Sequence, residues 1–121
     1  LTLTTDAFEF DDARTASQVE PLEQVIDILV ERLRAQHIKR LKDGACSIDT
    51  GVVYLDVLNN VERISDHCSN IAARLVGMEA GEDYDSHTLK NMMHHNPTKE
   101  YMLNYEQCRK DYLIPLEQLE A

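Results

Sequence analysis

The sequence predicts an all-α protein, a single domain over residues 1–121 whose three long helices form an antiparallel up-down bundle. Apolar residues recur at steps of three and four along most of the chain, which is the spacing of one helix face. Only four Gly and three Pro occur in 121 residues, so long stretches contain no helix breaker. With 43% hydrophobic residues, 6% aromatic residues and no Trp, the core is expected to be mostly aliphatic.

The first predicted element follows a short lead-in. Residues 1–10 are Thr-rich and alternate in polarity, so we expect an extended or disordered segment there. Helical spacing then runs over about residues 12–42, with Asp11 and Asp12 suited to the helix start and Gly44 to its end. Pro21 within this span either kinks the helix or marks its true first turn.

A second long helix is predicted over about residues 52–76. A short loop at 46–51 precedes it, and Gly77 and Gly81 bracket its exit. The apolar stripes of the first two long helices predict a set of core residues, which are Leu29, Leu33, Val61 and Ile71.

The C-terminal third predicts two further helices. Ser86 can cap a brief helix over residues 87–95. Asn96 and Pro97 then serve as cap and first residue of a third long helix over 97–120, and Pro115 should bend it near its end.

The charge balance limits the possible partners. A net charge of −10, with 22 acidic and 12 basic residues, argues against binding to nucleic acid or to an anionic membrane surface. Cations or a basic protein surface are the natural attractions for such a chain. The three scattered cysteines form no disulfide framework or CxxC site, and we expect a reducing compartment. No apolar run approaches the roughly 20 residues of a membrane span. Because the chain begins at Leu1 rather than Met, we expect a trimmed or internal fragment, outside which a membrane segment could lie.

Two acidic pairs are candidate metal ligands. Glu23 and Asp27 lie four residues apart at the edge of the first helix's apolar stripe, and Glu62 and Asp66 repeat the arrangement on the second. Like charges at this spacing repel each other, whereas a hard cation would turn four carboxylates into an oxygen ligand set. The alternative is a solvated acidic face that neighbouring arginines neutralise.

Other candidate residues give less support for chemistry. The adjacent histidines at 94 and 95 would point about 100° apart on a helix, which disfavours chelation of one ion. No Glu-x-x-His, nucleophile elbow, phosphate-binding Gly-rich loop or HExxH motif is present, so the sequence does not indicate an enzyme.

Two segments resemble known sequence motifs. Residues 57–72, VLNNVERISDHCSNIA, resemble the "ERIGDH…NIA" signature of the PhoU family, and residues 20–27, EPLEQVID, resemble its first-helix Glu-x-x-x-Asp motif. The resemblance covers about residues 15–76 and implies three-helix bundles whose acidic motifs bind iron, zinc or other cations. It implies ligand roles for Glu23, Asp27, Glu62 and Asp66, with iron, zinc or manganese as the metal. Ser65 stands where the family usually has Gly, which could alter how closely a neighbouring helix approaches.

Within that family, the chain resembles the cytoplasmic PhoU-like region that follows the membrane part of bacterial sodium/phosphate cotransporter-like proteins. That resemblance implies a regulatory domain that controls phosphate uptake by binding, at the cytoplasmic side of the cell membrane. Its partner would be the transporter membrane domain of the same polypeptide or a second copy, giving a homo-oligomer. The alternatives are a free-standing phosphate-uptake regulator, a helical dimerisation module without ligand, and a metal-dependent hydrolase or oxidase.

Overall fold

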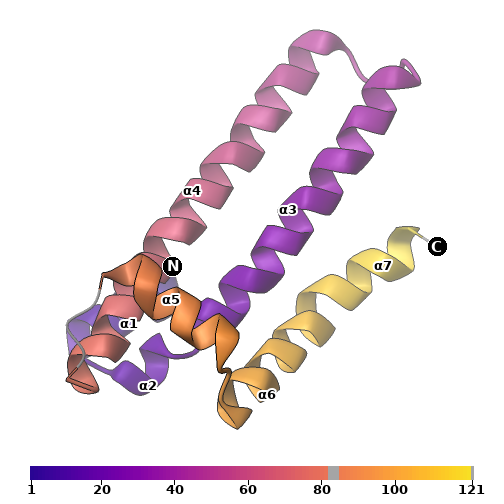
Figure 1. The fold of residues 1–121 in the computed structure, drawn as a ribbon. Coiled ribbons are helices and arrows are strands. Elements are labelled where there is room, and N and C mark those ends of the chain that lie inside the picture. The colour runs from indigo at the N-terminus through magenta and orange to yellow at the C-terminus, as the bar shows by residue number, and fades with distance from the viewer. Residues whose placement is uncertain (82–84, 121) are drawn as a thin grey trace.

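A computed structural model describes residues 1–81 and 85–120, and all the regular structure within these ranges is helical (Figure 1). The helical class predicted from the sequence is therefore confirmed. The elements in chain order are α1 (Thr2–Phe10), α2 (Ala13–Ala16), α3 (Val19–Lys42), α4 (Ile48–Glu79), α5 (Ser86–His95), α6 (Lys99–Cys108), η1 (Arg109–Leu113) and α7 (Ile114–Glu120).

The long helices run up, down and up along the molecule. α3 and α4 form an antiparallel hairpin, and the continuous segment from α6 through η1 to α7 lies along the lower part of α3 (Figure 1). α3 is the main packing partner of this last segment, so α3 stands between α4 and α6. α1 and α2 pack on the lower part of α4, and α5 crosses the same end of the hairpin.

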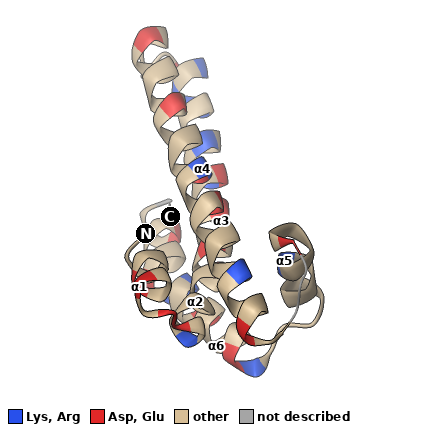
Figure 2. Ribbon diagram, turned by 90° about the vertical axis from the view of Figure 1, so that its left-hand side faces the viewer, with Lys and Arg blue, Asp and Glu red and all other residues tan. Residues whose placement is uncertain are grey.

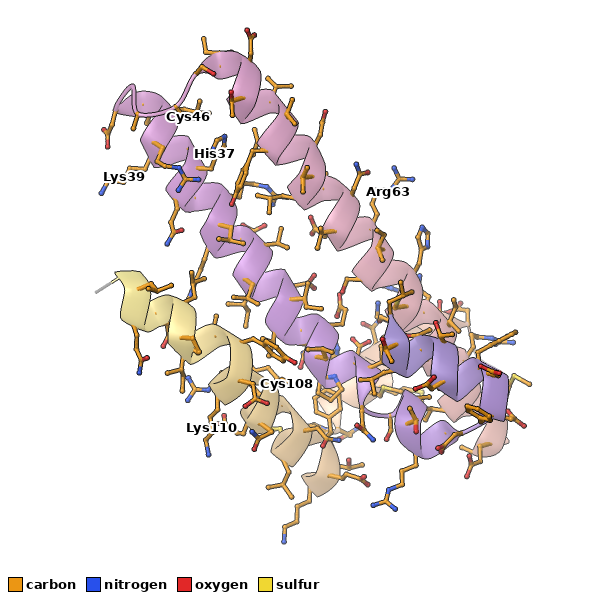
Figure 3. The ribbon with its side chains drawn as sticks, turned by 180° about the vertical axis from the view of Figure 1, so that it is seen from behind. His37, Lys39, Cys46, Arg63, Cys108 and Lys110 are labelled. Carbon is orange, nitrogen blue, oxygen red and sulfur yellow. The ribbon has the colours of Figure 1, made fainter. Side chains whose placement is uncertain are left out.

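The two hairpin helices approach each other closely near their turn. His37 of α3 is buried, and its Nε2 lies 3.2 Å from the carbonyl oxygen of Gly51 in α4. Figure 3 shows this ring between the two helices, where it also packs on Tyr54 with 4.4 Å between ring centroids. A Cβ at position 51 would lie 2.7 Å from Leu41 Cδ2, so any larger residue would require the Leu41 side chain or the helices to shift.

The expectation of an extended or disordered lead-in at residues 1–10 is wrong. Thr2–Phe10 forms helix α1, although its threonines have low helix propensity. The reason is tertiary packing: Ala7 and Thr4 are buried against α4, and Thr4 Oγ1 donates a hydrogen bond to the carbonyl oxygen of Cys68 at 3.5 Å.

The helix predicted at 12–42 is interrupted near its start. Asp12 caps as expected, accepting hydrogen bonds from the backbone N–H groups of Arg14 and Thr15, but the four-residue α2 that it begins stops at Ala16. α3 starts at Val19, so Pro21 lies in its first turn, where a missing N–H costs no intrahelical hydrogen bond. Of the two interpretations of Pro21, the structure supports the first-turn position.

The second helix is longer than the predicted 52–76, because Ser47 caps it through a hydrogen bond from the N–H of Thr50 and the helix continues to Glu79. The prediction that Val61 and Ile71 lie in the core is wrong, since these residues are 43% and 44% exposed. The buried face of α4 lies beside them and consists mainly of small residues: Ser65, Cys68, Ser69, Ala72 and Ala73. The other two expected core residues, Leu29 and Leu33, are half-buried.

The C-terminal helices start at different caps from those predicted. Asp85 rather than Ser86 caps α5, and Thr98 rather than Asn96 caps α6, with Thr98 Oγ1 accepting from the N–H of Tyr101 at 3.0 Å. Near Pro115, where a bend was predicted, the structure has a π-helix over Arg109–Leu113 that continues directly into α7. Because proline offers no N–H to the carbonyl four residues earlier, a locally widened helix accommodates the lost hydrogen bond.

Among the helices of residues 1–81 and 85–120, none is both long enough and apolar enough to cross a membrane.

Candidate metal centre

The four acids predicted as ligands border one groove. Glu23 and Asp27 come from α3, and Glu62 and Asp66 come from α4. They line an open groove of about 420 Å³ between the two helices, together with Asn59 and Arg63. Nevertheless, no three acidic, His or Cys side chains in the described residues converge closely enough to hold one ion in this conformation. The metal site therefore stays a prediction.

Glu23 is the most perturbed of these acids. Its side chain is only 6% exposed, although the groove beside it is open. Burial, a hydrogen bond with Asp27 and the nearby charges of Glu20 and Asp27 raise the pKa of Glu23 to about 8. At neutral pH the pair holds a proton, and a cation entering the groove would have to displace it.

Two of the acids already have basic partners. Arg34 Nη2 lies 3.1 Å from Glu62 Oε2 and 3.0 Å from Asn59 Oδ1. Lys90, which comes from α5, places its Nζ 3.2 Å from Asp66 Oδ1. Acidic and basic residues are therefore interspersed on the hairpin (Figure 2). The expected neutralisation by arginines holds for Glu62, whereas a lysine neutralises Asp66.

The Lys90 ammonium is a cation supplied by the protein itself. Besides Asp66, it donates to Asn70 Oδ1 at 3.4 Å. Burial disfavours the charged form, but the charges of Glu20 and Glu23 and the hydrogen bond to Asp66 outweigh this, so the pKa of Lys90 is raised. The side chains of Asp66 and Asn70 thus already bind the positively charged Lys90 ammonium. Their carboxylate and amide oxygens are the donor types that a hard divalent cation prefers, so the chemistry of the donor set fits such an ion, although its spacing in this conformation does not.

A buried cluster that was not predicted from the sequence lies next to the groove. Glu20 is buried; one of its carboxylate oxygens accepts a hydrogen bond from Ser69 Oγ, and the other lies 2.7 Å from His94 Nε2. The available signals were the three-residue spacing of Glu20 from Glu23 and the position of Ser69 within the segment DHCSNIA. The serine is not arranged as a nucleophile, since its hydroxyl is fully buried and donates to a carboxylate rather than to the histidine.

The remaining titratable candidates do not join these clusters. His95 Nδ1 lies 2.8 Å from the carbonyl oxygen of Asn91, so the adjacent histidines 94 and 95 contact different groups. This agrees with their expected divergence on a helix. Cys46, Cys68 and Cys108 are free thiols, and each lies on a different element or loop.

Comparison with known proteins identifies the family. The PhoU domain model matches residues 1–75, which is more than half of the chain and extends from α1 through most of α4. The chain belongs to the PhoU family. α5, α6 and α7 lie outside the matched region.

Curated relatives match over a similar region. The chain is 26% identical over 77 residues to the phosphate-specific transport system accessory protein PhoU homolog 1 of Thermotoga maritima, covering 64% of this chain and 33% of that protein. It is 34% identical over 79 residues to the PhoU homolog of Streptococcus pneumoniae, covering 65% of this chain and 37% of the relative. The chain thus spans about a third of the length of these relatives. No solved structure matches it significantly.

Proposed function

We propose that this chain is a cation-binding regulatory domain that controls phosphate uptake, and that it acts by binding rather than by catalysis. The observation that carries the proposal is that Glu23, Asp27, Glu62 and Asp66 all line one groove within the PhoU-matched region. The names of the relatives support the regulatory role, because they describe accessory proteins of phosphate-specific transport systems. α3, α4 and the α6–α7 segment supply the three-helix bundle of this domain.

The cation would be held by these four carboxylates, with the side-chain oxygen of Asn59 as a further donor. Iron, zinc and manganese are the candidates. A bound divalent cation would neutralise the negative charge of these carboxylates. The residues of the chain set the conditions for its entry: the Glu23–Asp27 pair must release its proton, and Asp66 and Glu62 must exchange their basic partners for the ion.

We further propose that the domain lies on the cytoplasmic side of the cell membrane, as part of a sodium-dependent phosphate transporter. The segment at residues 57–72 supports this interpretation by its resemblance to the transporter-linked PhoU regions. The full gene should then encode several apolar segments of about 20 residues upstream of this domain. A gene that instead encodes a second helical bundle and no such segment would favour a free-standing phosphate-uptake regulator.

The regulatory role is tested by phosphate uptake in cells. Alleles that carry Asp27→Asn or Asp66→Asn should change the response of uptake to external phosphate. Asp49→Asn, an exposed acid in the first turn of α4 and outside the groove, is the matched control and should leave the response unchanged. Normal regulation in both groove alleles would contradict the proposal.

A second candidate function, a helical association module, is favoured by one observation. α4 exposes a row of large apolar side chains along its surface, which are Val53, Val57, Val61, Ile64 and Ile71. Contiguous apolar surface of this kind is typical of interfaces. Sedimentation at micromolar concentration should show a dimer that Ile64→Glu dissociates. A monomer at all concentrations would exclude this function.

A further inference from the structure

α5 carries a cation to the edge of the acidic groove. Its Lys90 side chain is 15% exposed, and its Nζ contacts Asp66 and Asn70 of α4 at 3.2 and 3.4 Å. The carboxylates of Glu20 and Glu23 on α3 also act on this ammonium. Acids from both hairpin helices therefore face one positive charge, which comes from an element that the PhoU match does not cover.

Two further contacts hold α5 on the hairpin. Leu89 is buried over Gly77 of α4, where a Cβ would lie 2.7 Å from Leu89 Cδ1. His94 contacts Glu20 of α3 at 2.7 Å. α5 is thus attached by the apolar contact of Leu89 and by the polar contacts of Lys90 and His94, each of which pairs with an acid in or beside the groove.

We propose that Lys90 is the groove's built-in counter-cation and that α5 is a strap whose docking opposes the binding of a divalent cation. The inference rests on the proposed cation-binding function and adds a regulatory element to it. An ammonium and a divalent ion repel each other at this range, and both require Asp66. Binding of the ion should therefore release α5, and release of α5 should strengthen binding of the ion, because the two effects are reciprocal.

The test compares Mn²⁺ binding by calorimetry in the wild-type chain, Lys90→Met and Lys110→Met. Lys110 is exposed on the far side of the α6–α7 segment and controls for the change in net charge (Figure 3). We expect Lys90→Met to bind Mn²⁺ roughly five- to tenfold more tightly and Lys110→Met to bind like the wild type. Leu89→Ala, which loosens α5 without changing any charge, should also tighten binding. This second variant tests the strap should Lys90→Met not fold.

Amide hydrogen exchange provides the second readout. Addition of Mn²⁺ to the wild type should speed exchange in Ser86–His95 while α3 stays protected. Equal Mn²⁺ affinity in the wild type, Lys90→Met and Leu89→Ala, or unchanged exchange in α5, would overturn the strap and leave the cation site intact. Absence of Mn²⁺ binding in every variant would overturn the cation site and the strap together.

Discussion

Substitution of Glu23 by glutamine should stabilise the protein at neutral pH. A protonated Glu23 and a glutamine present similar polar atoms to the groove, and the amide can still donate to Asp27. The burial and neighbouring charges that raise the pKa of Glu23 to about 8 act against its ionised form only. Glutamine avoids that penalty.

The magnitude follows from the difference in pKa between the folded and unfolded chains. The carboxyl group has a folded pKa of about 8 and a reference value of 4.5. Because the folded state binds more protons between these values, the contribution of this group to stability is fully present below pH 4.5 and is lost as pH rises to 8. At about 1.4 kcal/mol per pH unit, the wild type loses at most about 3.5 kcal/mol by pH 7. Screening by water in the open groove reduces this, and we expect a gain of about 1–2 kcal/mol for Glu23→Gln at pH 7.

Urea unfolding between pH 4 and pH 8.5, with chelator present, measures this gain. The difference in unfolding free energy between Glu23→Gln and wild type should be small at pH 4 and grow steadily toward pH 8. Glu9→Gln, an exposed acid on α1, is the matched control and should show no such trend. A Glu23→Gln protein that is less stable than wild type at pH 7, or a difference that does not vary with pH, would refute the reasoning.

Three further predictions concern the packing of the helices and the cap of α6. Val25→Ala should lower the free energy of unfolding by about 2 kcal/mol because Val25 is fully buried, whereas Val53→Ala at an exposed site should change it by less than about 0.5 kcal/mol. Equal losses in urea unfolding would show that the wrong helix faces are assigned to the core. Gly51→Ala should cost about 1–3 kcal/mol, because its Cβ would meet Leu41 at 2.7 Å; an unchanged melting temperature would mean that the helices separate easily there. Thr98→Ala removes the N-cap of α6 and should destabilise this helix by about 1 kcal/mol, which would appear as faster amide hydrogen exchange in its first turn. Unchanged exchange there would argue against the cap.

The hairpin and its acids were predictable from the sequence because both depend on local spacing. Helical periodicity located α3 and α4, and the four-residue spacing of Glu23 with Asp27 and of Glu62 with Asp66 placed each pair on one helix edge. Facing edges of an antiparallel hairpin then bring the pairs to one groove, as the structure shows. The sequence alone could not show the protonation of Glu23, which depends on its burial and on the charges packed around it.

The errors arose where tertiary contacts outweigh local signals. α1 forms on a Thr-rich segment because Ala7 packs on α4. The position of the core face of α4 was misjudged because large apolar residues such as Val61 and Ile71 mark the stripe in the sequence. In the structure, small residues such as Ala72 are buried instead.

The contacts that α5 makes with the acids of α3 and α4 could not be predicted from the sequence either. Lys90 lies 24 positions after Asp66, and His94 lies 74 positions after Glu20. No periodicity links residues so far apart, and only the path of the chain across the end of the hairpin brings them together.

Thermal unfolding of the wild type and Asp27→Asn, with chelator and with zinc, iron(II) or manganese, tests the cation groove most directly. At free metal a hundred times its dissociation constant, the wild type should gain about 2.7 kcal/mol. Asp27→Asn should lose most of that gain, yet be slightly more stable than wild type in chelator because charge repulsion in the groove is relieved. A wild-type melting temperature that no metal changes, or an Asp27→Asn protein that is less stable both with and without metal, would contradict the cation-binding account.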